Sequence, residues 1–177
     1  EQVDPFLASG STTAGTDLDL ARVRMLRAVG GQTDRERITH ITSRRIDQLL
    51  DHEPAGPRLF ELIYLWAESL YEEHDASEHE VLAARAEVLI RRVTEPVSRA
   101  LLRFYALLAG PRSRGPDVVE ALDRQIEHVR QLTPSREQQR LLTMLLNTTA
   151  NKAWQTHPMT GESADATIRR IEDQYLD

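Results

Sequence analysis

Hydrophobic side chains recur every three to four positions along most of this chain, the period that places them on one face of an α-helix. The segment 77–93 is a clear case, with its main apolar positions at Leu82, Ala86, Leu89 and Val93. No stretch shows the strict alternation of apolar and polar residues that is typical of a half-buried strand. The pattern therefore predicts an all-α protein.

Capping residues, prolines and glycines divide this pattern into about eight helices. Thr33 with Glu36 and Ser77 with Glu80 form two capping boxes, in which each side chain bonds a backbone N–H at the helix start. The expected helices are 17–29, with Thr16 as the N-cap, then 33–51, 57–71, 77–93, 97–109, 116–130, 134–156 and a last one from about Ser163. Apolar residues cover most of the circumference in 57–71, so we expect this helix to be central.

Connections of about two to six residues join most of these helices, so sequential neighbours should run antiparallel. The predicted fold is an irregular antiparallel helical bundle of about seven to eight helices, with stacked helical hairpins as the alternative. The bundle is favoured because no motif recurs at a fixed period. Residues 1–16 are rich in Gly, Ser, Thr and Ala and are expected to form a flexible N-terminal tether, whereas 17–177 form a single helical domain.

Composition and charge exclude several classes of protein. Of the 177 residues, 40% are hydrophobic and 28% are charged, an ordinary globular composition that supports a folded, soluble chain. The net charge of −6 repels phosphate backbones, so nucleic acid is not an expected partner. The chain has no cysteine, which excludes disulfides and thiolate metal ligands. No apolar run is long enough for a transmembrane segment.

The tether leaves the compartment open between two hypotheses. In one, a lipidated cysteine lies upstream of Glu1 and anchors an exported envelope protein. In the other, the tether is the frayed terminus of a cytoplasmic protein, which is the simpler interpretation. The oligomeric state does not follow from the sequence.

The segment 33–50, with Thr42-Ser43-Arg44-Arg45-Ile46 at its middle, resembles a helix-turn-helix whose second helix would offer arginines to DNA. It lacks the glycine turn often found in that motif, and the surrounding charge is acidic. One continuous capped helix is the simpler interpretation of this segment.

The densest polar cluster surrounds the turn after residue 71 and consists of Glu72, Glu73, His74, Asp75, Glu78, His79 and Glu80. A histidine and a carboxylate four positions apart can coordinate zinc or manganese. The cap at Ser77 and the preference of acidic residues for helix starts already explain much of the cluster, so we expect no metal and no cofactor. No nucleophile elbow or phosphate-binding loop is present, so no catalytic residue is assigned.

Two further sets of residues are candidates for binding. One is an aromatic set that could line a pocket between helices, although such residues are more often core: Tyr64, Trp66, Phe104, Tyr105 and Trp154. The other is the pair Arg112 and Arg114, which could contact an anion or an acidic partner from a loop rich in glycine and proline.

The function favoured by the sequence is a non-enzymatic helical protein-interaction module, of the adaptor, pilot or scaffold type, with an unidentified protein partner. The alternative is a ligand-sensing regulatory helical domain that binds a small apolar molecule between its helices. An enzyme that uses a metal at the acidic cluster comes last, because no base, nucleophile or electrophile can be named from the spacing.

Overall fold

The computed structural model describes residues 12–29, 32–52, 56–71, 76–110, 117–156 and 169. These residues form seven α-helices, namely α1 (Thr12–Val29), α2 (Gln32–His52), α3 (Pro57–Tyr71), α4 (Ala76–Arg92), α5 (Pro96–Ala109), α6 (Asp117–Arg130) and α7 (Arg136–Thr156). The described ranges contain no β-strand, so the all-α prediction is confirmed.

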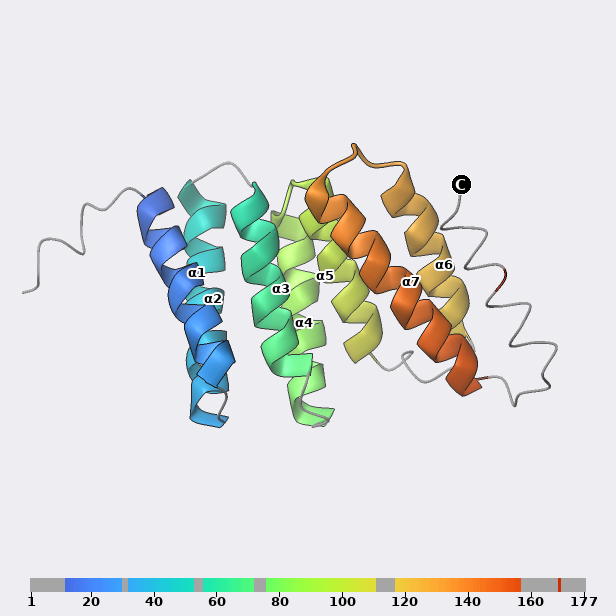
Figure 1. Cartoon of the computed structure of the whole chain (residues 1–177), viewed down its shortest axis with the longest axis horizontal. Coiled ribbons are helices and arrows are strands. Elements are labelled where there is room, and N and C mark those ends of the chain that lie inside the picture. The colour runs from blue at the N-terminus through green and yellow to red at the C-terminus, as the bar shows by residue number, and fades with distance from the viewer. Residues whose placement is uncertain are drawn as a thin grey trace, which may run out of the picture.

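The helices follow one another in a row along the long axis of the molecule, from the α1/α2 end to the α6/α7 end (Figure 1). Odd-numbered helices run in one direction and even-numbered helices in the other, as the short connections predict. Each helix packs on the next in sequence, and α1 with α3, α3 with α5, and α5 with α7 are also in contact. The packing of a helical bundle is thus confirmed, and the row has the arrangement expected of stacked hairpins.

The central position predicted for α3 is confirmed. This helix contacts α1, α2, α4 and α5, and its apolar residues are buried on almost every side. Phe60 and Trp66, two of its aromatic side chains, are both 2% exposed. The hydrophobic core that contains them is continuous and includes side chains from all seven helices.

The expected start of α1 after Thr16 is wrong, because α1 begins at Thr12 and Thr16 is buried within it. A contact with α2 explains the longer helix. The guanidinium of Arg45 lies against Gly15, where a Cβ would be 3.1 Å from it, and pairs with Asp19 at 2.5 Å. This tertiary contact outweighs the low helix propensity of glycine and threonine.

α5 ends at Ala109 as predicted and begins at Pro96, one residue before the predicted start. Glu95 caps the first turn, since its carboxylate accepts the N–H groups of Val97 at 2.8 Å and Ser98 at 2.5 Å. At the other end the N–H of Gly110 donates to the carbonyl of Ala106 at 3.0 Å. A Cβ on Gly110 would lie 2.7 Å from that oxygen, so glycine fits this close approach and other residues do not.

Two other sequence predictions concern the extent of helices. α2 is a single uninterrupted helix, which agrees with the capped-helix interpretation of the segment 33–50. α7 begins at Arg136 and not at residue 134, because the hydroxyl of Ser135 accepts the N–H of Gln138 at 3.1 Å and acts as the cap.

Several predictions lie wholly or partly outside the described residues. They are the tether up to residue 11, part of the acidic cluster at 72–75, the loop 111–116 and the last helix from Ser163. Residues 12–16 of the expected tether are helical. Among the helices that the structure describes, none is long and apolar enough to cross a bilayer.

Candidate functional site

A half-open groove of about 790 Å³ lies between α1, α3 and the first turns of α7. Its walls hold Asp17, Leu20 and Arg24 from α1, Pro57, Arg58, Phe60 and Glu61 from α3, and Arg136, Glu137 and Arg140 from α7. The α1 residues are three and four positions apart, and those of α3 and α7 fall within five consecutive positions in each helix, so each helix offers one short face to the groove. The groove therefore follows from the way α1 and α7 flank α3.

Ion pairs join α1 to α3 along the groove. The Arg58 guanidinium donates to both carboxylate oxygens of Asp17, at 2.7 and 2.9 Å. The hydrogen bond from Arg58 lowers the pKa of Asp17 below its ordinary value, outweighing the opposing effect of burial. One face of α3 thus bears the charges that hold α1.

Arg140 of α7 lies over the middle of α3. Its guanidinium donates to Glu61 at 2.6 Å and is centred 3.9 Å from the ring of Tyr64, within cation–π distance. Burial lowers the pKa of Arg140, but its interactions with Glu61 and, to a smaller extent, with Tyr64 together outweigh that effect and raise it overall. Glu61 also lies 3.4 Å from Arg24. The carboxylate of Glu61 therefore pairs with two guanidinium groups, one from α1 and one from α7.

Arg136 differs from the other groove arginines. It is the first residue of α7, it is exposed, and among the described residues it has no ion-pair partner. The groove walls carry four arginines and three carboxylates, so they hold an excess of positive charge on an acidic chain. The N-terminal end of the α7 dipole adds to that charge.

The same face of α3 continues beyond the groove to Glu68. Its carboxylate accepts a hydrogen bond from the Tyr105 hydroxyl of α5 and lies 3.4 Å from Arg27 of α1. Burial raises the pKa of Tyr105 well above its ordinary value, and the negative charge of Glu68 raises it further. Glu68 thus links three helices through one carboxylate.

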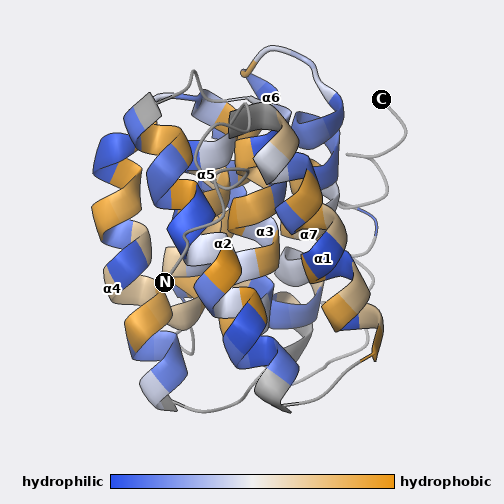
Figure 2. Ribbon diagram, turned by 90° about the vertical axis from the view of Figure 1, so that its left-hand side faces the viewer, coloured by the Kyte–Doolittle hydropathy of each residue, from blue (hydrophilic) through white to orange (hydrophobic). Residues whose placement is uncertain are grey.

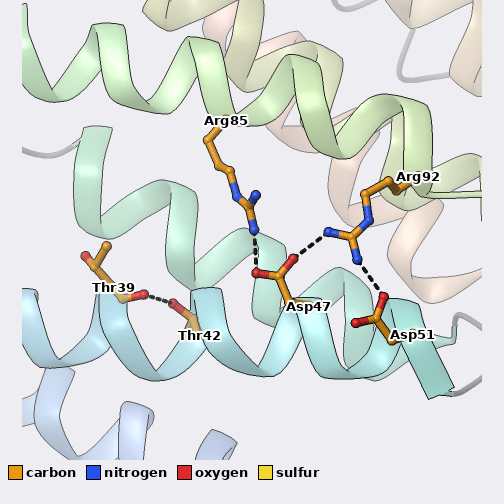
Figure 3. Close-up of polar contacts among 6 residues, drawn as sticks. All are labelled: Thr39, Thr42, Asp47, Asp51, Arg85 and Arg92. Carbon is orange, nitrogen blue, oxygen red and sulfur yellow. Dashed lines mark hydrogen bonds and ion pairs between the residues drawn. The ribbon is translucent and has the colours of Figure 1, made fainter.

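A second charged cluster joins α2 to α4 (Figure 3). Arg85 and Arg92 both donate to Asp47 at 2.6 Å, and Arg92 also donates to Asp51 at 2.8 Å. Two cations face two carboxylates, so this cluster is neutral and its charges satisfy one another. We assign it to the packing of α4 on α2, in contrast to the unbalanced groove.

The structure places the predicted aromatic set in two different environments. Trp66, Phe104 and Tyr105 are each at most 2% exposed and belong to the core, where the last two rings meet edge to face at 5.2 Å. Tyr64 is half-buried beneath Arg140. The side chain of Trp154 lies outside the described residues. The apolar ligand pocket stays a prediction.

The loop pair Arg112 and Arg114 lies outside the described residues, so its role as an anion or partner contact also stays a prediction. Of the acidic cluster, the described His79 stacks on Tyr71 with ring centroids 5.1 Å apart. The described residues contain no group of three or more side chains placed to hold a metal ion.

The sequence prediction missed the groove arginines, Arg24, Arg58, Arg136 and Arg140. No local pattern marks them, because the residues that they face are far away in sequence. Arg140 and Glu61, for example, are 79 positions apart. Comparison with family models, curated proteins and solved structures finds no match to this chain.

Proposed function

We propose that this chain is a non-enzymatic protein-interaction module, of the adaptor, pilot or scaffold type, that binds an acidic extended segment of a partner protein in the groove between α1, α3 and α7. The observation that carries the proposal is the excess of arginine in this groove on a chain whose net charge is −6. A local positive site on an acidic surface directs an acidic segment to one place.

The chemistry of the groove fits carboxylates. Guanidinium groups form paired hydrogen bonds with carboxylates, and these charge-assisted bonds are stronger than neutral ones. Arg136 and Arg140 lie one helical turn apart on α7 and project to the same side. Among the described residues no carboxylate pairs with Arg136, so its guanidinium can take an incoming carboxylate, while Arg140 can share its remaining donors with a second one.

The size of the groove is sufficient for a few residues of a peptide. Its volume of about 790 Å³ lies within the range of about 300–1,000 Å³ typical of small-molecule sites, which is room for a short stretch of chain. The three helices that form it run in the same direction, and the lining residues lie in the first turns of α3 and α7 and in the middle of α1. Asp17, Glu61 and Glu137 separate its cations, so a segment with spaced carboxylates fits better than the continuous charge of a nucleic acid.

Fluorescence anisotropy with a labelled peptide of six glutamates flanked by glycine and serine tests this proposal. We expect saturable binding that weakens as salt is added, and little binding of the matching glutamine peptide. Arg136→Ala should weaken binding by about fivefold or more, corresponding to about 1 kcal/mol, without loss of stability, because this residue is exposed.

Arg91→Ala is the matched control. Arg91 is also exposed near a helix end and has no ion-pair partner among the described residues, but it lies on α4, away from the groove. This variant should bind the glutamate peptide like the wild type. Equal binding by Arg136→Ala and the wild type would overturn the proposal, as would tighter binding of a single-stranded oligonucleotide than of the peptide.

A further inference from the structure

The helix α1 makes few apolar contacts with the rest of the molecule. It packs on α2 and α3 at the end of the row that Figure 2 shows from outside, where hydrophobic stretches of ribbon lie among hydrophilic ones. Its buried hydrophobic side chains are Leu20 and Val23. Leu18, Met25 and Val29, by contrast, are 70%, 64% and 74% exposed. Burial of apolar surface therefore contributes little to the docking of α1.

Ion pairs supply much of the remaining attachment of α1. Asp17 pairs with Arg58 of α3, and these two side chains are 55% and 44% exposed. Arg24, whose side chain is 62% exposed, lies 3.4 Å from Glu61 of α3. Pairs exposed to this degree contribute little free energy, because water screens the charges and the side chains lose freedom. We therefore expect α1 to detach locally while the other helices of the row stay folded.

The helices α1 and α7 line the same groove but are not packed closely on each other. Glu61 of α3 joins them indirectly, since its carboxylate lies 3.4 Å from Arg24 of α1 and 2.6 Å from Arg140 of α7. Arg136, at the start of α7, is exposed and lines the groove as well. Both walls therefore offer cations to a ligand that lies between them.

We propose that an acidic segment bound in the groove locks α1 in its docked position, because its carboxylates pair with Arg24 of α1 and with Arg136 of α7 at the same time. This inference rests on the proposed function, since it requires the segment in the groove. The contact of Arg24 with Glu61 is long, so little is lost when Arg24 turns to a carboxylate of the ligand. The bound segment thus adds a direct bridge between α1 and α7 across the groove.

Undocking of α1 takes one wall of the groove away. The residues that leave with it are Asp17, Leu20 and Arg24. Arg136 and Arg140 stay on α7, so the undocked form retains only part of the site. A ligand that binds the docked form more tightly shifts the equilibrium toward that form. The coupling is reciprocal, so any change that undocks α1 also weakens the binding of the segment.

Hydrogen exchange of the full chain, followed by mass spectrometry with and without the six-glutamate peptide, tests the inference. A peptide at about ten times its Kd lowers the population of undocked α1 about elevenfold if that form does not bind at all. Because α7 keeps two arginines, we expect a smaller effect, with the exchange of α1 amides slowed at least about threefold. The matching glutamine peptide should leave the exchange of α1 unchanged.

Arg24→Ala tests the bridge itself. This change removes the α1 cation from the groove and leaves Arg136 and Arg140 in place. The docked and undocked forms should then bind the peptide almost alike, so the slowing of α1 exchange should fall to less than about 1.5-fold. Each variant is measured at about ten times its own Kd and compared with its own peptide-free sample, because Arg24→Ala also loosens α1 by itself.

Arg22→Ala is the matched control, since it removes an exposed arginine from the same helix. Arg22 does not line the groove. In this variant the peptide should slow the exchange of α1 amides as it does in the wild type, by at least about threefold.

The outcomes separate this inference from the proposed function. Peptide binding that leaves α1 exchange unchanged in the wild type would overturn the inference alone. So would equal slowing in Arg24→Ala and Arg22→Ala, because Arg24 would then form no bridge. The same conclusion follows if the most protected amides of α1 and α4 exchange equally fast without peptide, since α1 would then open only with the whole chain. A wild type that does not bind the peptide would overturn both.

Discussion

The helices α1 and α6 lie toward opposite ends of the row and divide their apolar residues in opposite ways. α6 buries Val118, Leu122, Ile126 and Val129, each at most 2% exposed, and presents mainly charged side chains to water. α1 is four residues longer, at 18 residues against 14, yet its buried apolar residues are only Leu20 and Val23. The remaining apolar positions of α1 point mostly outward.

Ion pairs show the reverse contrast. Among the described residues, the pairs of α1 connect it to other helices, as in Asp17 with Arg58 and Asp19 with Arg45. Those of α6 lie within the helix, as in Glu120 with Arg124. Polar contacts thus contribute much of the docking of α1, whereas apolar burial dominates the docking of α6.

The comparison shows that a helix can be long and well formed without being firmly attached. Apolar burial is insensitive to pH and salt, whereas pairs between exposed charges are weak and screened. We therefore expect α1 to open locally at a lower free energy than α6, and to respond to conditions that leave α6 unchanged.

Leu122→Ala should have the largest effect. Leu122 lies on the buried face of α6 and is fully buried, so its truncation leaves a cavity and should lower the free energy of unfolding by about 3–4 kcal/mol. Leu20→Ala, the corresponding change in α1, should cost about 2 kcal/mol, because Leu20 borders the groove and its site is already open on one side. Urea denaturation followed by circular dichroism measures both, and equal losses would contradict the comparison.

Arg45→Ala should have the next largest effect, and that effect should be confined to α1. Arg45 and Asp19 are 17% and 24% exposed, so their contact is better shielded from water than the other α1 pairs. Its loss should cost about 1.5–2 kcal/mol, near the lower end of the about 1.5–3 kcal/mol that a hydrogen bond to a charged group contributes, because the pair is partly exposed. Hydrogen exchange should show faster opening of α1 amides and unchanged amides in α6. Uniform acceleration along the chain would instead show that α1 opens only with global unfolding.

Acid should weaken the attachment of α1 to a smaller extent. The Arg58 hydrogen bond lowers the pKa of Asp17 in the folded protein, so this pair stabilises the fold above the unfolded pKa of about 3.9. The contribution is lost as the pH falls through the folded pKa. Asp17→Asn should therefore melt below the wild type at pH 7, and the difference should shrink below about pH 4. A difference that is the same at both pH values would contradict this assignment.

The features predictable from sequence are those set by local chemistry. The helices were predicted from their apolar periods, and the ends of α5 were predicted to within one residue because the residues that cap them, Glu95 and Gly110, act within one turn. The predicted start of α1 was wrong because the residue that stabilises its first turns, Arg45, belongs to another helix. Periodicity also predicted the central position of α3, since only a helix that is contacted on several sides is apolar on several sides.

The candidate site could not be predicted for the same physical reason. An arginine on a helix surface has the same local pattern whether it faces water or a groove, and only the groove that α1 and α7 form with α3 separates the two cases. Tyr64 was singled out as an aromatic residue, yet its notable contact is with Arg140 of a distant helix. The buried Trp66 and Phe104 show that aromatic residues at helical spacing mark the core first.

Arg124→Ala should have the smallest effect, and it provides the sharpest control for the comparison. Arg124 and Glu120 are each 69% exposed and lie four positions apart on α6, where such a pair contributes about 0.3–0.5 kcal/mol. Because α6 is held by its buried face, removal of this pair should leave the exchange of α6 amides within about twofold of the wild type, equivalent to less than about 0.5 kcal/mol. Both Arg124→Ala and Arg45→Ala remove one guanidinium from an ion pair. A difference between their effects on hydrogen exchange therefore comes from the position of the arginine and not from the loss of its charge. If Arg124→Ala opened α6 as far as Arg45→Ala opens α1, ion pairs would support both ends of the row alike.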